Sequence, residues 1–178
     1  MADYPYLFCQ IRQPLSTYLV FPRHSSQNRR YIPIGFMPSS VIAGDACSII
    51  PNVTIYEFGV LTSNVHNAWM RVTCGRIKSD FRYSPAVYNN FPWPTPTLEQ
   101  KAKIEQTAQA ILNARAMYPN NCLADLYSPL AMPEPLLKAH IANDRAVMQA
   151  YGLSVKDTSE ADCVAFLMKR YQELTQTK

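Results

Sequence analysis

Four charged residues in this sequence alternate with uncharged ones: Arg76, Lys78, Asp80 and Arg82. Alternate residues of a β-strand point to the same face, so the spacing predicts a strand over Arg76–Arg82 with one charged face. Such a face is unsuited to a core, because buried charges need partners. We therefore expect it to meet water or a charged ligand. Basic side chains contact the phosphates of nucleic acids, and both basic and acidic side chains form hydrogen bonds with base edges.

The net charge of +4 comes entirely from the first half of the chain. Residues 1–95 contain eight Lys or Arg and four Asp or Glu, whereas residues 96–178 contain nine of each kind. Six of the eight basic residues lie in two clusters, 23–30 and 76–82. Arginine-rich patches suit nucleic acid, but a solvated basic surface has the same composition.

Catalytic motifs are absent from the sequence. It contains no phosphate-binding glycine loop, no GxSxG, no HExxH and no closely spaced Cys or His pair for zinc. One weak pattern, Asp80 followed by Glu99 and Lys101, fits the acid plus ExK outline of metal-dependent nucleases. Glu99 also falls in the first turn of a predicted helix, where the helix dipole favours an acid. His66 lies in an apolar periodic segment, and we expect it to be packed or capping. We assign no catalytic or metal-binding residue.

Length and composition predict a globular protein of one medium or two small domains, with 178 residues and 48% hydrophobic content. No apolar run approaches the roughly 20 residues of a membrane span. The start of the sequence lacks the basic and apolar regions of a secretory signal. The five cysteines are scattered without a CxxC motif, which indicates free thiols and a cytoplasmic location.

Residues 1–95 predict a small mixed domain. Short runs of aromatic and β-branched residues between turn-forming residues indicate strands. Besides the charged segment, the expected strands are Tyr6–Ile11, Thr17–Phe21, Tyr31–Phe36 and Ile49–Val53. Three-and-four spacing of apolar residues predicts one helix over about 57–74 that ends at Gly75.

Residues 96–178 predict a helical bundle after a stiff PWPTP linker at 92–96. Thr97 and Gln100 form a capping-box pattern for a helix that ends before Pro119. A second helix begins near Pro135 and ends at Gly152. Ser159 begins a third, amphipathic helix. The predicted fold class is therefore α+β, with domains 1–95 and 96–178.

Several segments together resemble the C-terminal region of the MmeI-like, type IIL restriction–modification enzymes. They are IPIGF (32–36), FGVLTSNVHNAWMRVTCGRIKSDFRYS (58–84), YNNFPWP (88–94) and DRAVMQAYG (144–152). Members of that family join an endonuclease, an adenine-N6 methyltransferase, a target-recognition domain and a helical tail. This sequence lacks the [NDS]PP[YF] motif and the glycine-rich cofactor loop. The resemblance thus implies a non-catalytic recognition portion of a longer enzyme. It also implies that S-adenosylmethionine and Mg²⁺ belong to other domains of the parent chain and not to this one.

The resemblance also implies which residues read bases in double-stranded DNA. The family's paired reading positions fall on Arg23 with Asp45, Ala46 with Arg82, and Lys78 with Asp80. Arg or Lys can donate to guanine and Asp can accept from cytosine, so a base beside an acid suits a G·C pair. A surface ion pair between Lys78 and Asp80 is the plainer alternative. Further basic residues are candidates for phosphate contacts: Arg12, Arg29, Arg30, Arg71 and Arg76.

Two other functions stay open at this stage. The neutral helical half could dock a methyltransferase or another subunit, which would make the chain an assembly module. The acid plus ExK outline would instead make it a nuclease. Salt-sensitive DNA binding distinguishes recognition from assembly, and metal-dependent cleavage would indicate a nuclease. The aromatic segment from Tyr88 to Trp93 is expected to pack rather than to stack on bases.

Overall fold

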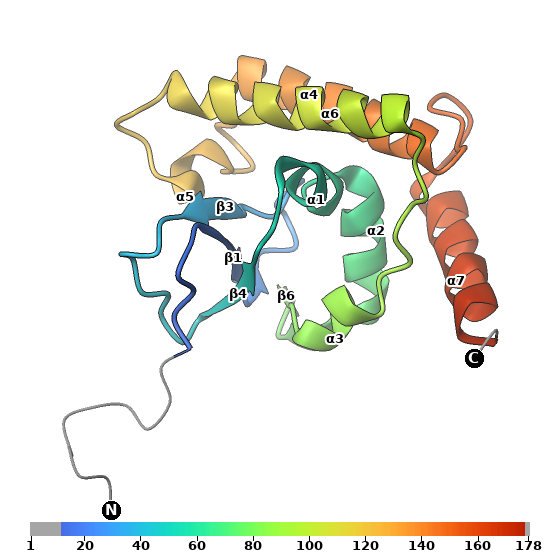
Figure 1. The fold of residues 1–178 in the computed structure, drawn as a ribbon, viewed down its shortest axis with the longest axis horizontal. Helices are drawn as coiled ribbons and strands as arrows, with labels where there is room; N and C mark the ends of the chain where they lie inside the picture. Colours follow the sequence, from blue (N-terminus) through green and yellow to red (C-terminus); the bar gives the residue numbers. More distant parts are fainter. Residues whose placement is uncertain (1–11, 177–178) are drawn as a thin grey trace, which may run out of the picture.

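The computed structural model describes residues 12–176, which form two small antiparallel sheets and seven helices (Figure 1). This arrangement confirms the predicted α+β class. The strand expected at Tyr6–Ile11 lies outside the described residues. The strands are β1 (Tyr18–Pro22), β2 (His24–Ser25), β3 (Gly35–Met37), β4 (Cys47–Pro51), β5 (Gly75–Ile77) and β6 (Asp80–Arg82). The helices are α1 (Ile55–Leu61), α2 (Asn64–Thr73), α3 (Pro85–Asn89), α4 (Leu98–Ala116), α5 (Leu123–Leu126), α6 (Glu134–Ala150) and α7 (Glu160–Gln176).

Each sheet has three strands, in the orders β3-β1-β4 and β2-β6-β5. The strands β1 and β4 confirm two predictions to within two residues at each end. The prediction for Tyr31–Phe36 is mostly wrong, because β3 begins only at Gly35. Ile34 donates its backbone N–H to the carbonyl of Ile32, two residues back, and this local turn takes the segment out of the ladder. A single residue separates β1 from β2, so one extended segment serves both sheets.

The helix expected over 57–74 is two helices, α1 and α2. Thr54 and Glu57 form a capping box that starts α1 earlier than predicted. Ser63 breaks the helix, because its extended backbone and its hydroxyl, which accepts from the His66 N–H, cap a new helix there. Apolar periodicity continues through the break, so spacing alone did not reveal it.

The three long helices of the second half confirm their predictions. The Thr97–Gln100 capping box begins α4, and Ser159, which directly precedes α7, exchanges hydrogen bonds with Asp162 of its first turn. Gly152 ends α6 with φ of +73°, a left-handed conformation that glycine adopts without strain. The short helices α3 and α5 were not predicted.

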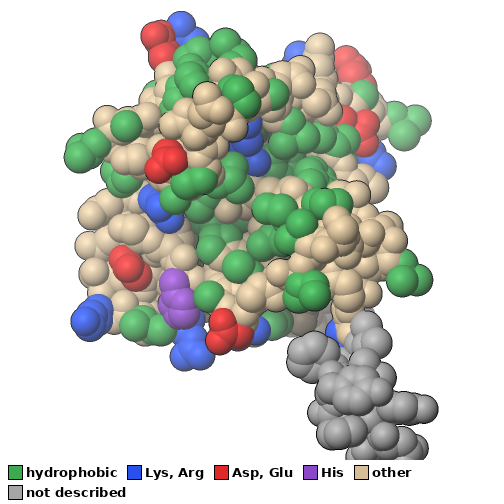
Figure 2. Space-filling view, turned by 90° about the vertical axis from the view of Figure 1, so that its left-hand side faces the viewer, with side chains coloured by type: hydrophobic (Ala, Val, Ile, Leu, Met, Phe, Trp, Pro, Cys, Tyr) green, Lys and Arg blue, Asp and Glu red, His purple; other side chains and the backbone are tan. Residues whose placement is uncertain are grey.

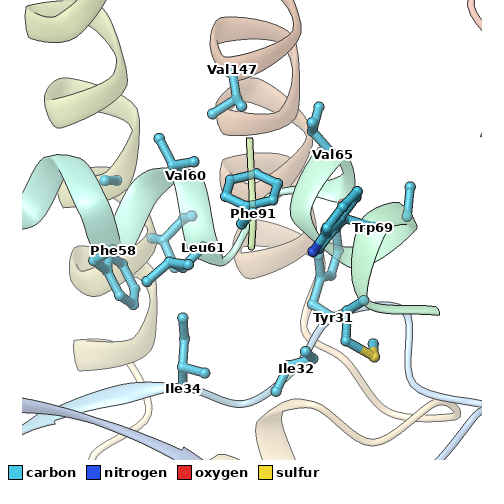
Figure 3. Close-up of a cluster of buried hydrophobic side chains, with 14 of the residues drawn as sticks. Tyr31, Ile32, Ile34, Phe58, Val60, Leu61, Val65, Trp69, Phe91 and Val147 are labelled. Carbon is cyan, nitrogen blue, oxygen red and sulfur yellow. The ribbon is translucent and has the colours of Figure 1, made fainter. Parts of the chain in front are cut away.

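Both halves of the chain contribute to one hydrophobic core. The helices α4 and α6 lie side by side along one edge of the molecule, α1 packs beneath α4, and α7 lies beside α2 (Figure 1). Figure 3 shows Ile34, Phe58, Trp69, Phe91 and Val147 converging from different segments. The C-terminal helices therefore bury their apolar faces against the first half as well as against each other.

Helix α1 approaches α4 closely at Gly59. A Cβ atom at this position would lie 2.7 Å from Ile104 Cγ2 and 3.0 Å from Ala108 Cβ. The Gly59 carbonyl accepts a hydrogen bond of 2.7 Å from the Asn143 side chain of α6. Three helices thus meet where only a glycine fits.

A buried carboxylate also joins the two halves. Asp144 of α6 accepts from the Tyr31 hydroxyl at 2.6 Å and from the backbone N–H of Asn64 at 2.8 Å. Burial raises the pKa of Asp144 to about 6, although these hydrogen bonds and Arg30 act in the opposite direction. Asp144 therefore holds the segment before β3 and the start of α2 against α6.

The substitution Gly59→Ala should lower the free energy of unfolding by about 1–3 kcal/mol, because the added methyl group overpacks the contact between α1 and α4. Gly44→Ala is the matched control, since a Cβ there meets nothing within 4 Å. Urea unfolding of both variants measures the difference. Equal stability of the two would contradict the close approach.

The stability of the protein should depend on pH through Asp144. Its proton is bound more tightly in the folded state than in the unfolded chain, where the pKa is about 3.9. The resulting stabilisation is full below about pH 4 and is lost as the pH rises through about 6. As the pH falls from about 7 to about 4, the free energy of unfolding of the wild type should therefore rise relative to that of the Asp144→Asn variant. Urea unfolding across this range tests the prediction, and a constant difference would refute it.

Candidate nucleic-acid interface

Arg23 lies where the two sheets meet. Its backbone N–H donates to the Ala46 carbonyl at 2.9 Å, and its carbonyl accepts from the Tyr83 N–H at 2.8 Å. The loop before β4 and the end of β6 are therefore both held against Arg23. Four of the six proposed reading residues thus belong to three segments that meet here: Arg23, Asp45, Ala46 and Arg82.

The charged segment forms a hairpin, so the prediction of one strand over Arg76–Arg82 is wrong. β5 and β6 pair with Ile77 opposite Asp80, and the connection between them is Lys78 and Ser79. Lys78 has φ of +53°, the left-handed region typical of tight turns. Lys78 and Asp80 therefore lie together at the hairpin tip and not on one strand face. Periodicity could not show this, because the turn lacks the glycine that usually marks one.

Arg76 lies on the face of the hairpin opposite to Asp80 and Arg82, because its cross-strand partner is Phe81. Its guanidinium lies 4.2 Å from the centre of the Phe81 ring. It also donates to the Ser79 carbonyl at 2.9 Å and to the Gln27 side chain at 3.3 Å. Arg76 therefore supports the turn that carries Lys78.

The proposed reading residues present their side chains to solvent. Asp80 is half-buried, and the other five are exposed: Arg23, Asp45, Ala46, Lys78 and Arg82. The ion pairs of residues 12–176 are Arg71–Glu160 and Lys138–Glu134. Neither Lys78 with Asp80 nor Arg23 with Asp45 forms an ion pair among these residues. Figure 2 shows basic and acidic side chains near an exposed histidine along the lower edge of one face.

The candidate phosphate contacts differ in their surroundings. Arg71 on α2 forms an ion pair of 2.6 Å with Glu160 of α7. The Arg30 guanidinium lies 5.5 Å from the centre of the Tyr31 ring. Arg12 and Arg30 are exposed, and Arg29 is half-buried. Arg71 thus links the two halves of the chain, and Arg76 contacts residues of its own hairpin.

Tyr83 anchors the end of β6. Its ring stacks on Phe21 at 4.8 Å between centres, and its hydroxyl lies 3.0 Å from His66 Nε2. Burial lowers the pKa of His66 to about 4, so the ring is neutral. This confirms that His66 is packed. This role of Tyr83 is not visible in the sequence, because its partners lie far away along the chain.

The aromatic segment after α3 packs as predicted. Phe91 is buried and contacts the rings of His66, Trp69 and Trp93. The Trp93 carbonyl accepts two hydrogen bonds from Arg170 of α7. This segment therefore fixes the linker to the C-terminal helix.

The described residues contain no group of three His, Cys, Asp or Glu side chains that could hold a metal ion. Asp80 lies on β6 and Glu99 at the start of α4, elements that are well separated in Figure 1. Within residues 12–176, no helix has the length and apolar character that a membrane span needs. Their four cysteines are free thiols.

Comparisons with known proteins agree on both halves of the chain. Residues 1–95 match the family described as MmeI, target recognition domain, and residues 97–178 match MmeI, C-terminal domain. DNA methyltransferase A of Bacillus subtilis (strain 168) is 35% identical over 177 residues, which are 99% of this chain and 20% of that protein. A solved structure of the type IIL restriction–modification enzyme MmeI in complex with DNA is 47% identical, with a TM-score of 0.88. That match covers 93% of this chain and 22% of the MmeI chain, so this chain spans about a fifth of either relative.

Arg76→Ala should destabilise the protein by about 1 kcal/mol, because it removes a cation–π contact and a hydrogen bond to the turn. Arg82→Ala, on the opposite face of the same hairpin, should change stability by less than about 0.5 kcal/mol. Thermal unfolding of both variants measures the two effects. Equal losses would show that Arg76 does not support the turn.

Proposed function

Because the chain belongs to the MmeI family of restriction–modification enzymes, we propose that it is the sequence-specific DNA-recognition part of a type IIL enzyme. Residues 1–95 read the DNA, and residues 96–178 form a helical domain that supports them. The observation that carries this proposal is the meeting of three segments at Arg23. Backbone hydrogen bonds hold these segments together, so their side chains remain available to a ligand.

The shape of the interface suits the major groove of double-stranded DNA. That groove is about 12 Å wide and admits a two-stranded β-ribbon. The β5–β6 hairpin is such a ribbon, with Lys78 at its exposed tip. Inserting the tip brings Lys78 and Asp80 to the base edges, while Arg82 and Arg23 follow along the groove.

The residue types give each pair a preference. Arg23 with Asp45 and Lys78 with Asp80 each combine a donor for guanine with an acceptor for cytosine, so each reads a G·C pair. Ala46 is small and leaves Arg82 free to contact either purine. The target then has two guanine positions with a purine-tolerant position between them. The last guanine lies beside the adenine that the whole enzyme methylates.

Phosphate contacts come from the remaining basic residues, which position the protein without specifying sequence. Arg12, Arg29 and Arg30 lie on or near the described surface of the first half. Arg71 and Arg76 belong to the same set, although each already has partners within the protein.

Catalysis belongs to other domains of the parent enzyme. This chain spans about a fifth of its relatives, and no residue in it is assigned to chemistry. The methyltransferase domain would bind S-adenosylmethionine, and the endonuclease domain would bind Mg²⁺. The helical half, which has exposed Leu98 and Leu130, would face these domains. An enzyme of this kind acts on DNA in the cytoplasm.

Exchanging the charges at the hairpin tip tests the proposal. In the double variant Lys78→Glu, Asp80→Arg, the donor and the acceptor trade places, so one position of the selected site should change from G to C. Selection from a randomised duplex pool at low salt measures the preference of each protein. The net charge is unchanged, so phosphate attraction stays nearly constant.

The matched control exchanges an exposed ion pair on α6, Glu134→Arg with Lys138→Glu. Its selected site should equal that of the wild type. If the hairpin variant binds every sequence equally less well, Lys78 and Asp80 contact only phosphate. If the wild type binds no DNA at any salt concentration, the proposal fails and the alternative of an assembly module is favoured.

A further inference from the structure

His24 lies beside Arg82 on the proposed reading surface. In the β2–β6 pair, His24 is directly opposite Arg82, and Ser25 is opposite Phe81. Ser25 and Phe81 are buried, whereas His24 and Arg82 are exposed. Because directly paired residues point to the same face, the imidazole and the Arg82 guanidinium project together toward solvent.

Ala46 has no side-chain group that can form a hydrogen bond on this surface. In the proposed Ala46/Arg82 pair only Arg82 can donate, because a methyl group makes no hydrogen bond. The backbone of Ala46 is bonded to Arg23, the residue next to His24. His24 is therefore opposite Arg82 in the sheet and adjacent in the chain to the residue that bonds to Ala46.

The ring of His24 has no hydrogen bond, ion pair or ring contact within residues 12–176. The charged residues nearest to it in the sheet and chain are Arg82, Asp80 and Arg23. A neutral imidazole carries one donor and one acceptor nitrogen, and its two tautomers exchange these roles. His24 is thus free to offer either a donor or an acceptor to a ligand.

We propose that His24 reads the pyrimidine partner of the purine that Arg82 contacts. Arg82 donates to N7, which guanine and adenine share in the major groove. The partner is then cytosine, which offers an amino donor, or thymine, which offers the O4 acceptor. One tautomer of His24 accepts from cytosine, and the other donates to thymine. This gives a physical basis for the purine tolerance proposed above, and it rests on the proposed function.

The test replaces His24 with a side chain that can accept a hydrogen bond but cannot donate one. An aspartate only accepts, so His24→Asp should favour cytosine and shift the position from either purine to guanine by about tenfold, the discrimination of one good contact. His24→Asn keeps a donor and an acceptor and should retain both purines. Selection from a randomised duplex pool, followed by binding to duplexes that differ only at this position, measures the ratio. The relevant position of the DNA target is the one at which the Arg82→Ala variant no longer prefers a purine.

Asn28→Asp is the matched control, because it adds the same charge at an exposed position that follows His24 closely in the chain but lies outside the paired strands. It should weaken binding to all duplexes alike and leave the ratio of guanine to adenine unchanged. An unchanged ratio in His24→Asp would overturn the inference while the proposed function stands. A uniform loss of binding in His24→Ala would assign His24 to a phosphate and overturn it too. If the wild-type chain selects no sequence, the proposed function fails, and the inference that rests on it fails too.

Discussion

The close contact between α1 and α4 at Gly59 is the constraint on which the rest of the structure depends. Without a side chain at this point, α1 lies directly on α4, and the Gly59 carbonyl accepts from Asn143 of α6. The neighbouring Phe58 then reaches the Phe36 ring at 5.4 Å between centres, which brings the first sheet onto the same core. The chain continues through the capped break at Ser63 into α2 and from there into the hairpin. The position of the proposed reading surface therefore follows from a helix contact in the interior.

The helical half is part of the support for residues 1–95, the half that we propose reads DNA. Asp144 holds Tyr31 and the start of α2, and Arg115 of α4 donates to the Ile34 carbonyl. Buried polar groups of this kind are costly unless they are satisfied, so each one selects a single relative placement of the segments that it joins. The segment between β2 and β3 contains no helix or strand, so these contacts determine its conformation.

On the proposed reading surface, the contacts that hold the segments together are separate from the side chains that we propose contact DNA. Arg23, Ala46 and Tyr83 are linked through backbone atoms, which every residue type except proline can supply as donor and acceptor. Tyr83 is anchored inward by Phe21 and His66, while its neighbour Arg82 projects outward. We therefore expect that side chains on this surface can be exchanged at little cost to the fold.

The sequence by itself determined the α+β class, the three long C-terminal helices, β1 and β4, and the charged character of the segment around Lys78. These are local properties: capping residues such as Thr97, the helix-ending Gly152, and the alternation of residue types act within a few positions. Only the tertiary structure decided that residues 76–82 form a hairpin, that a helix breaks at Ser63, and that Arg23, Ala46 and Arg82 meet. The hairpin and the break at Ser63 form between neighbouring residues, but the turn lacks a glycine and apolar periodicity continues through Ser63, so the sequence pattern does not reveal them. The meeting of Arg23, Ala46 and Arg82 depends on pairing across tens of residues, where the free energy comes from burying Phe81 and Tyr83 and not from local preference. His24 was overlooked for the same reason, because its place beside Arg82 exists only in the register of β2 with β6.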